Sequence, residues 1–525
     1  MSTVESSLRW LEKAGDRLNA ILVKETRQSL KSRQFVATFL LLVFSSWVIS
    51  VFGVAMMGDA INYGASGQRL FVFYFVVLMI AVTVIVPYGA FRSMLGEKDQ
   101  NTFDSLRITS LSPWQIVWGK LMSAVVQDFI YYSAIAPFIA FTSLLEGFEL
   151  PSVAFLLLCG LLLSVAFSIM ALMVSTFAHQ RHWQGILSIM LLIGLLSMLG
   201  TTTSSLLALF SDSSMLQDWR FWLGFGIVVF LGILYCWLFL QITSAQLTFE
   251  SGNRSSGIRL ISTLQFLIMN ALILGLAFWY SGFDDEIFFI ICSLTYIQLI
   301  AVGLVSVTEE NFLSRRIRKS LPSRRISRFL LAPFLPGGSR GMAYLMLNLG
   351  ICYGLQIVTI LVMMNTSTRS YGSIDEVIPF LTGLVFYIII YLGFASAFGR
   401  IGNGMIENLK PNHVRVITLL VFAIGCIIPM MAKALEFLSW RRYSLFEIIN
   451  PFATLYEISD RNQWSDPVLV ILGIAASVAL LFNLKAMVLS LYEIRGFQTQ
   501  QQTETVEVEP FQIPEAPPAS SLEEG

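Results

Sequence analysis

Residues 153–177 read VAFLLLCGLLLSVAFSIMALMVSTF, a run of 25 residues without one charged side chain. The hydrocarbon core of a bilayer is about 30 Å thick, so a helix that crosses it needs about 20 mostly apolar residues. This run is long enough and apolar enough to do so. It therefore predicts a membrane-spanning helix.

Similar runs recur along the chain on both sides of this one. The other predicted spans lie near residues 35–56, 70–90, 121–141, 185–200, 221–242, 260–280, 287–307, 342–364, 377–398, 416–434 and 467–488. The pattern predicts an all-α polytopic membrane protein with about twelve transmembrane helices, arranged as two six-helix halves.

Composition agrees with this class of protein. Of the 525 residues, 55% are apolar and 13% are charged, whereas soluble chains average roughly 25% charged residues. The spans leave no room for a large soluble catalytic domain. Lys and Arg together number 34, as do Asp and Glu, so no excess of basic residues points to nucleic acid. The lipid bilayer is the predicted surrounding.

The basic residues predict the orientation of the spans, because Lys and Arg are retained on the cytoplasmic side. With the N-terminus inside, the inside segments hold 26 Lys and Arg and the outside segments hold six. An even number of spans also requires both termini on one side. We therefore expect both termini in the cytoplasm, and we expect the plasma membrane, in a bacterium the cell membrane, as the location.

The predicted organisation follows from these spans. An amphipathic cytoplasmic leader helix at 1–34 precedes a first six-helix half at 35–242, which contains a long cytoplasmic segment at 92–120. A cytoplasmic connection at 243–259 leads to a second half at 260–488, which contains a basic cytoplasmic loop at 308–341 and an external loop at 435–466. A largely disordered acidic tail at 489–525 follows. In the external loop, Asn450-Pro451-Phe452 predicts a break between two short helices.

The segment at 92–120 has the pattern of a short helix, a turn and a second helix that continues into the third span. Asn101 or Thr102 is a candidate cap for a turn over residues 103–108, and Ser112 before Pro113 predicts the N-cap of the second helix. Phe103, Leu106 and Leu111 are apolar residues in this loop. Such an element suits the transmission of force from a cytoplasmic partner.

This part of the chain resembles the permease subunit of ABC-2 type transporters, over roughly residues 20–245. The resemblance rests on Lys24-Glu25-Thr26-Arg27 in the leader and on Leu111-Ser112-Pro113-Trp114-Gln115-Ile116-Val117-Trp118-Gly119-Lys120 before the third span. In that family an acidic residue, a Gly-Thr-Leu-like turn, a Leu-Ser-Pro-like break and a Gly-Lys pair form the segment that docks on a separate ATP-binding subunit. Here Asn101-Thr102-Phe103 replaces the usual turn. The resemblance implies an ATPase-coupling segment made by Glu97, Asn101, Thr102, Phe103, Leu106, Leu111, Ser112, Pro113 and Trp114.

Family members usually have six spans and pair with a second copy. The resemblance therefore implies that the second half is a diverged repeat within one chain, a pseudo-dimer, or else that the chain pairs with itself as a homodimer. The loop after the eighth span matches the first segment in spacing. Its Phe312, Arg316, Ile317 and Pro322 are a candidate second coupling segment. Against a full repeat, residues 243–259 lack a long amphipathic leader.

No Gly-x-x-x-x-Gly-Lys-Ser/Thr motif occurs in the chain, and this motif is what cradles nucleotide phosphates. ATP hydrolysis is therefore expected in a separate subunit, and the chain itself is not expected to be an enzyme. The alternative function is an ion-gradient-driven secondary transporter of two six-helix repeats. A membrane-embedded enzyme or scaffold ranks last, because no nucleophile constellation is evident.

Few polar residues fall inside the spans. Asp128 lies in the third span, where a charge is costly, so it either faces a pathway or is satisfied by a neighbouring span. His179 and His182 lack an accompanying carboxylate or thiol, so neither a metal site nor a cofactor is predicted. Gly350 and Gly354 predict close helix packing in the ninth span.

Overall fold

The computed structural model describes most of the chain, and the statements below concern those residues. They are 20–57, 66–99, 112–143, 145, 150–178, 181–211, 215–249, 252–279, 285–319, 321–322, 324–366, 374–405, 409–435, 437, 443–460 and 464–504. Within these ranges every regular element is a helix and no strand occurs. Twelve of the helical stretches are long and apolar enough to cross a membrane. The predicted fold class is confirmed.

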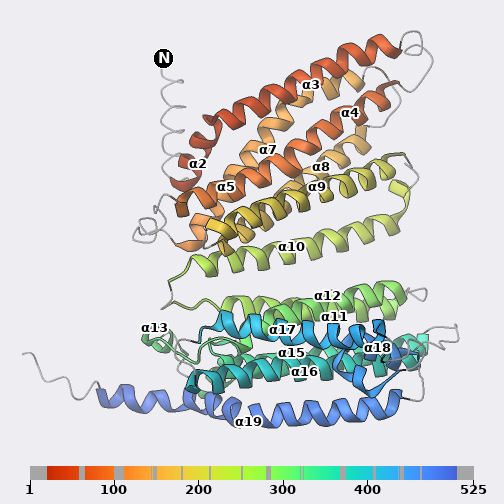
Figure 1. Cartoon of the computed structure of the whole chain (residues 1–525). Helices are drawn as coiled ribbons and strands as arrows, with labels where there is room; N and C mark the ends of the chain where they lie inside the picture. The colour runs from red at the N-terminus through yellow and green to blue at the C-terminus, as the bar shows by residue number, and fades with distance from the viewer. Residues whose placement is uncertain are drawn as a thin grey trace, which may run out of the picture. The chain divides into compact units, whose positions relative to one another are not determined.

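The chain divides into two units, residues 1–250 and 251–525, and the long helices within each unit run side by side (Figure 1). Unit 1 begins with a short helix and continues with six spans, of which the second is built from three consecutive helical pieces. Its elements are α2 (Ala20–Leu30), α3 (Arg33–Met57), α4 (Ser66–Ile80), η2 (Ala81–Ile85), α5 (Val86–Asp99), α7 (Pro113–Ser143), α8 (Leu150–Phe177), α9 (Arg181–Ser211), η3 (Met215–Gln217) and α10 (Trp219–Leu247).

Unit 2 also contains six spans, and its short helices lie between the second and third spans and between the fifth and sixth. Its elements are α11 (Ser256–Trp279), α12 (Asp285–Val307), α13 (Arg315–Lys319), α14 (Arg325–Leu331), η4 (Ala332–Phe334), α15 (Gly338–Thr366), α16 (Ile374–Met405), α17 (Pro411–Ala434), η5 (Leu445–Ile449), α18 (Pro451–Ser459) and α19 (Ser465–Glu504).

The six spans of the two units share a pattern of neighbours. In each unit the third span packs against the first, second, fourth and sixth, and the fourth also packs against the second, fifth and sixth. These central pairs are α7 with α8 in unit 1, and α15 with α16 in unit 2. A repeated six-helix unit produces this agreement, since equivalent helices then take equivalent neighbours.

The units differ in what surrounds the spans. Among the described residues, α2 directly precedes the first span of unit 1 and no such helix precedes that of unit 2, in agreement with the missing leader at 243–259. In unit 2 the break between η5 and α18 falls at Asn450, whose side-chain oxygen accepts hydrogen bonds from Phe452 N and Ala453 N at 3.0 and 3.4 Å. The predicted pair of short helices is confirmed. The helix α19 continues to Glu504, beyond the predicted end of the last span at residue 488.

The middle of the second span of unit 1 departs from α-helical geometry. Residues Ala81–Ile85 form a π-helical segment, and four of the five are buried. A π-segment inside an α-helix widens one turn and often marks a functional position. Here it lies where the span contacts both α8 and α9.

Two glycines at the start of α15 allow a close backbone approach in unit 2. A Cβ atom at Gly338 would lie 2.6 Å from the carbonyl oxygen of Val307, and one at Gly341 would clash with the backbone of Ser306. The end of α12 therefore packs directly on the first turn of α15. At Gly350 and Gly354, where close packing is predicted, a Cβ would meet nothing within 4 Å among the described residues, so unit 2 itself shows no close helix contact there.

We expect Gly341→Ala to destabilise the protein and Gly350→Ala to leave it unchanged or slightly more stable. The methyl group of Gly341→Ala forces the α12 backbone away, and such overpacking lowers the free energy of unfolding by about 1–3 kcal/mol. Gly350→Ala makes the same substitution in the same helix without a clash, and alanine favours a helix over glycine by about 1 kcal/mol. Reversible unfolding in mixed micelles measures both, and equal losses for the two variants would contradict the assignment of the contact.

Candidate coupling site

The helix that follows the predicted coupling segment has a well-defined start. The hydroxyl of Ser112 accepts a hydrogen bond from Gln115 N at 3.3 Å, and the side chain of Gln115 accepts one from Ser112 N at 2.9 Å. This reciprocal pair is a capping box. Pro113 is the first residue of α7, which runs unbroken to Ser143. The predicted N-cap and the continuation into the third span are confirmed.

About two turns into α7, a lysine is buried between two carboxylates from other helices. Lys120 Nζ lies 3.0 Å from Glu25 Oε1 of α2 and 3.1 Å from Glu97 Oε1 of α5, and only 1% of its side chain is exposed. Lys120 also donates to Ser93 Oγ at 2.8 Å. Ser93 Oγ in turn donates to Glu25 Oε2 at 2.7 Å. We call Glu25, Ser93, Glu97 and Lys120 the lysine clamp.

The two carboxylates of the clamp face two lysines, one within the clamp and one beside it. Lys24 Nζ approaches Glu97 Oε1 at 3.8 Å from the solvent side, so two lysines face two carboxylates. Burial alone would raise the pKa of Glu25, but the charge of Lys120 and the hydrogen bonds from Ser93 and Lys120 outweigh it. They hold the pKa of Glu25 below its usual value. Glu25 is therefore ionised at neutral pH.

The clamp fixes the geometry around the predicted coupling segment. Glu97 lies near the end of α5, three residues before residues 100–111, and Lys120 lies near the start of the helix that follows them. Their ion pair brings the two flanking helices together, and Glu25 adds α2 to the same point. A cavity of about 350 Å³ adjoins the clamp and is lined by polar residues of α2, α5 and α7, including Gln28, Arg92 and Gln127.

The structure describes four of the nine predicted coupling residues. Glu97 lies in the clamp, Ser112 and Pro113 form the start of α7, and Trp114 is half-buried with its ring 6.0 Å from that of Trp118. Asn101, Thr102, Phe103, Leu106 and Leu111 lie outside the described residues. Glu97 near the end of α5 and the other three at the start of α7 thus flank residues 100–111 on the two sides.

Unit 2 has its own buried ionic cluster at the corresponding place, between the second and third spans. Arg259 of α11 is fully buried, and its Nη2 lies 2.7 Å from Glu309 Oε2, just after α12. Its Nη1 donates to the carbonyl oxygens of Pro333 and Leu335 at 2.9 and 2.6 Å. Glu309 also accepts from Gly337 N at 3.1 Å. An arginine thus ties the first span to both ends of the basic loop.

The predicted second coupling segment is divided between surface and core. Phe312 is 67% exposed and Arg316 is exposed. Ile317 is buried and packs with Leu313, and Pro322 O accepts a hydrogen bond from Arg328 Nε. Ile317 therefore supports the loop from inside, and the structure does not bring it to the surface with Phe312.

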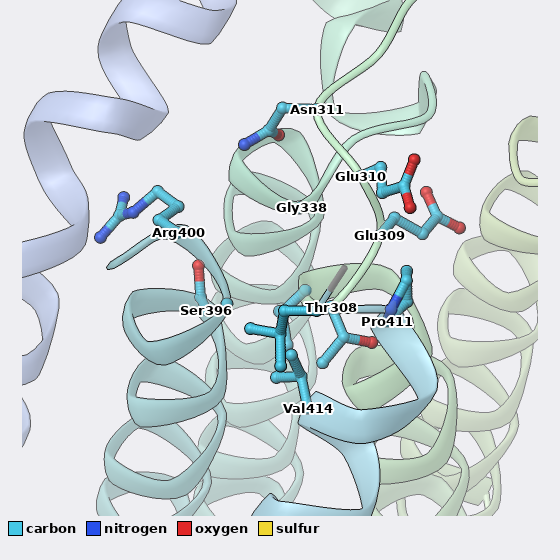
Figure 2. A pocket seen from close by; sticks show the side chains of 12 residues that line it. Thr308, Glu309, Glu310, Asn311, Gly338, Ser396, Arg400, Pro411 and Val414 are labelled. Atoms are coloured by element: carbon cyan, nitrogen blue, oxygen red, sulfur yellow. The ribbon is translucent and has the colours of Figure 1, made fainter. Parts of the chain in front are cut away.

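A second polar pocket, of about 220 Å³, lies beside the arginine cluster (Figure 2). Thr308 and Glu309 line it from the end of α12, Ser396 from α16, and Pro411 and Val414 from the start of α17. Arg415 Nε donates to Thr308 Oγ1 at 2.9 Å. The pocket joins three spans of unit 2 at the end where Arg259 pairs with Glu309.

Asp128 is fully buried in α7 and faces α8. Both of its carboxylate oxygens lie 2.8 Å from Ser164 Oγ, which donates to them. Within the described part of the chain it has no ion pair, and no cluster of His, Cys, Asp and Glu there suits a metal ion. His179 lies outside the described residues.

The sequence pattern marked Glu97 as a coupling residue and Glu25 and Lys120 as parts of the family resemblance, but it did not mark Ser93, Arg259 or Glu309. Lys120, Arg259 and Glu309 lie at or near the ends of apolar runs, where charged residues usually reach water. The opposite charges of Arg259 and Glu309 at the ends of two neighbouring spans were the available signal for that pair. Nothing in the sequence pairs Lys120 with Glu25, which lies 95 positions earlier.

No protein-family model, curated protein or solved structure matches the chain. The class that the fold defines is a multi-pass α-helical membrane protein with twelve helices capable of spanning the membrane. Such an architecture fits a membrane transporter in general.

We expect Lys120→Met to lower the free energy of unfolding by about 3–5 kcal/mol, the loss typical when one partner of a buried ion pair is removed. The exposed Lys31→Met, at the end of α2, is the matched control and should change stability by less than about 0.5 kcal/mol. Adding Glu25→Gln to Lys120→Met should restore part of the loss, because fewer uncompensated charges stay buried. Unfolding in mixed micelles tests the set, and equal effects of the two lysine variants would exclude a structural role for the clamp.

Proposed function

We propose that the chain is the membrane-spanning permease subunit of an ATP-binding-cassette transporter of the ABC-2 type, driven by a separate ATP-binding subunit. The observation that carries the proposal is the lysine clamp around residues 100–111. It joins α5 and α7, the two helices on either side of these residues, and a docking segment needs such fixed neighbours if movement of a partner is to reach the spans. The same proposal puts the chain in the plasma membrane, in a bacterium the cell membrane.

The mechanism follows from the connections of the clamp. A push on residues 100–111 acts on α5 through Glu97 and on α7 through the capped helix start. Both helices pack against α8, a central span of unit 1. Closure of paired ATPases would therefore move a block of spans and not a loop alone. The substrate path of the permease would open and close in response.

The repeated neighbour pattern supports a pseudo-dimer within one chain, with unit 2 in the place of the second copy. The basic loop of unit 2 then takes the position of a second docking segment, although only Phe312 and Arg316 of its predicted contacts are exposed. A homodimer of the whole chain is the alternative assembly. In either arrangement, the chain performs no covalent chemistry itself.

The test is co-purification of the ATP-binding subunit with the tagged full chain from its native membrane. Phe103→Ala should reduce the bound ATPase about thirtyfold, because loss of an apolar anchor from an interface costs about 2 kcal/mol or more. Phe446→Ala removes a half-exposed ring from η5, predicted to lie on the other side of the membrane, and is the matched control. Phe312→Ala tests the second segment. An ATPase that stays bound to the Phe103 variant, or leaves both Phe103 and Phe446 variants equally, would contradict the proposal.

A second candidate function is an ion-gradient-driven secondary transporter, and Asp128 is the observation that favours it. Among the described residues its one hydrogen-bond partner is a hydroxyl. A buried carboxylate of this kind is an unusual feature of a membrane span and is a common element of proton relays. For such a carrier, solute movement should continue after ATP depletion and stop when the proton gradient is collapsed. Asp128→Asn should then reduce transport at least about tenfold, and the exposed Asp466→Asn should not. Transport that stops on ATP depletion excludes this candidate.

A further inference from the structure

The loop between α12 and α15 carries an unusual concentration of positive charge. Residues 311–341 contain eight Lys and Arg and no Asp or Glu. Arg316, Lys319 and Arg324 are exposed, and within the described part of the chain no ion pair joins them to an acid. These charges therefore face outward and are available to an anionic partner.

The same loop presents apolar side chains beside these charges. On α14, Ile326, Phe329 and Leu330 are 77%, 63% and 64% exposed. Their spacing of three and four residues places them on one helix face. A helix with exposed apolar residues on one face and arginines around it is typical of a membrane interface.

A groove of about 530 Å³ lies between α14 and α19. Ile326 and Phe329 form one side, Val488, Leu491 and Tyr492 form the other, and Arg328 is the one basic residue of its lining in the described structure. The α19 residues belong to the last two turns of the twelfth span, which ends at Ile494. Figure 1 shows α13 at the end of unit 2 from which α19 continues. The groove thus opens where the span leaves the membrane.

The groove walls are held in place by packing beneath them. Leu313 and Ile317 of the α13 region pack with Leu335 and Ile494 in one buried cluster. Arg328 Nε donates to Pro322 O, which fixes the turn before α14. The surface is therefore preformed and needs no rearrangement to accept a ligand.

We propose that this surface, formed by α13, α14 and the last turns of the twelfth span, binds an anionic phospholipid of the adjacent leaflet. An acyl chain lies in the α14–α19 groove, and the phosphate is held by the exposed Arg316, Lys319 and Arg324. This inference is independent of how transport is powered.

The position of the groove favours a lipid over an acidic protein. Exposed apolar side chains of α19, such as Phe482 at 68% and Leu489 at 58%, lead along the span to the groove. A lipid tail already in contact with the span reaches it without leaving the apolar phase. The arginines then add attraction that an uncharged headgroup lacks.

The experiment is native mass spectrometry of the full chain in mild detergent, with phosphatidylglycerol or phosphatidylcholine added. The unchanged protein should retain one phosphatidylglycerol in clear preference to phosphatidylcholine. Lys319→Glu with Arg324→Glu should reduce that preference about fivefold for each basic residue changed, since one such residue near an anionic headgroup contributes a factor of that order. Ile326→Ser with Phe329→Ser should reduce retention of both lipids.

Arg220→Glu is the matched control, because Arg220 is an exposed arginine between two exposed tryptophans in unit 1. It should leave the retained lipid unchanged. Equal retention of the two lipids by the unchanged protein, or charge variants that behave like the control, would overturn the proposal. So would variants that keep the lipid but lose an acidic protein partner, since the surface would then be a protein-docking site.

Discussion

The lysine clamp is the interaction on which the arrangement of unit 1 depends. An ammonium group with 1% of its side chain exposed is unfavourable unless opposite charges surround it. Lys120 meets this requirement only if α2 and α5 both stay against α7, because Glu25 comes from one and Glu97 from the other. Three segments far apart in the sequence are thereby held at one point, next to the loop that the sequence marks as a docking element.

In unit 2 an arginine, Arg259, takes the place of the buried lysine of unit 1. Arg259 has more donors than a lysine and spreads them over a carboxylate and several backbone carbonyls. It therefore fixes a loop as well as a neighbouring helix. The glycines at the start of α15 complete this junction, since they allow its backbone to approach the end of α12 closely. Both units thus hold the ends of their second and third spans together through a buried cation.

These junctions relate the fold to transport. The central third and fourth spans contact most other helices of their unit, so a displacement at the clamp is shared by many helices. Asp128 differs from the junction charges, because it lies deeper in α7 and, within the described structure, is hydrogen-bonded to one hydroxyl of α8. Its position between two central spans is the feature that favours an ion-gradient-driven transporter over an ATP-driven one.

The sequence by itself determined the number of spans, the start of α7 at Ser112 and Pro113, and the break at Asn450, because each depends on local composition or on capping within a few residues. Only the tertiary structure decided that Lys120 pairs with Glu25 and that Arg259 joins the basic loop, since these contacts link residues separated by 50 or more positions. It also moved the close helix approach from Gly350 to Gly341. Spacing within one helix shows which residues share a face, but the neighbour that the face meets is set by the packing of the whole unit.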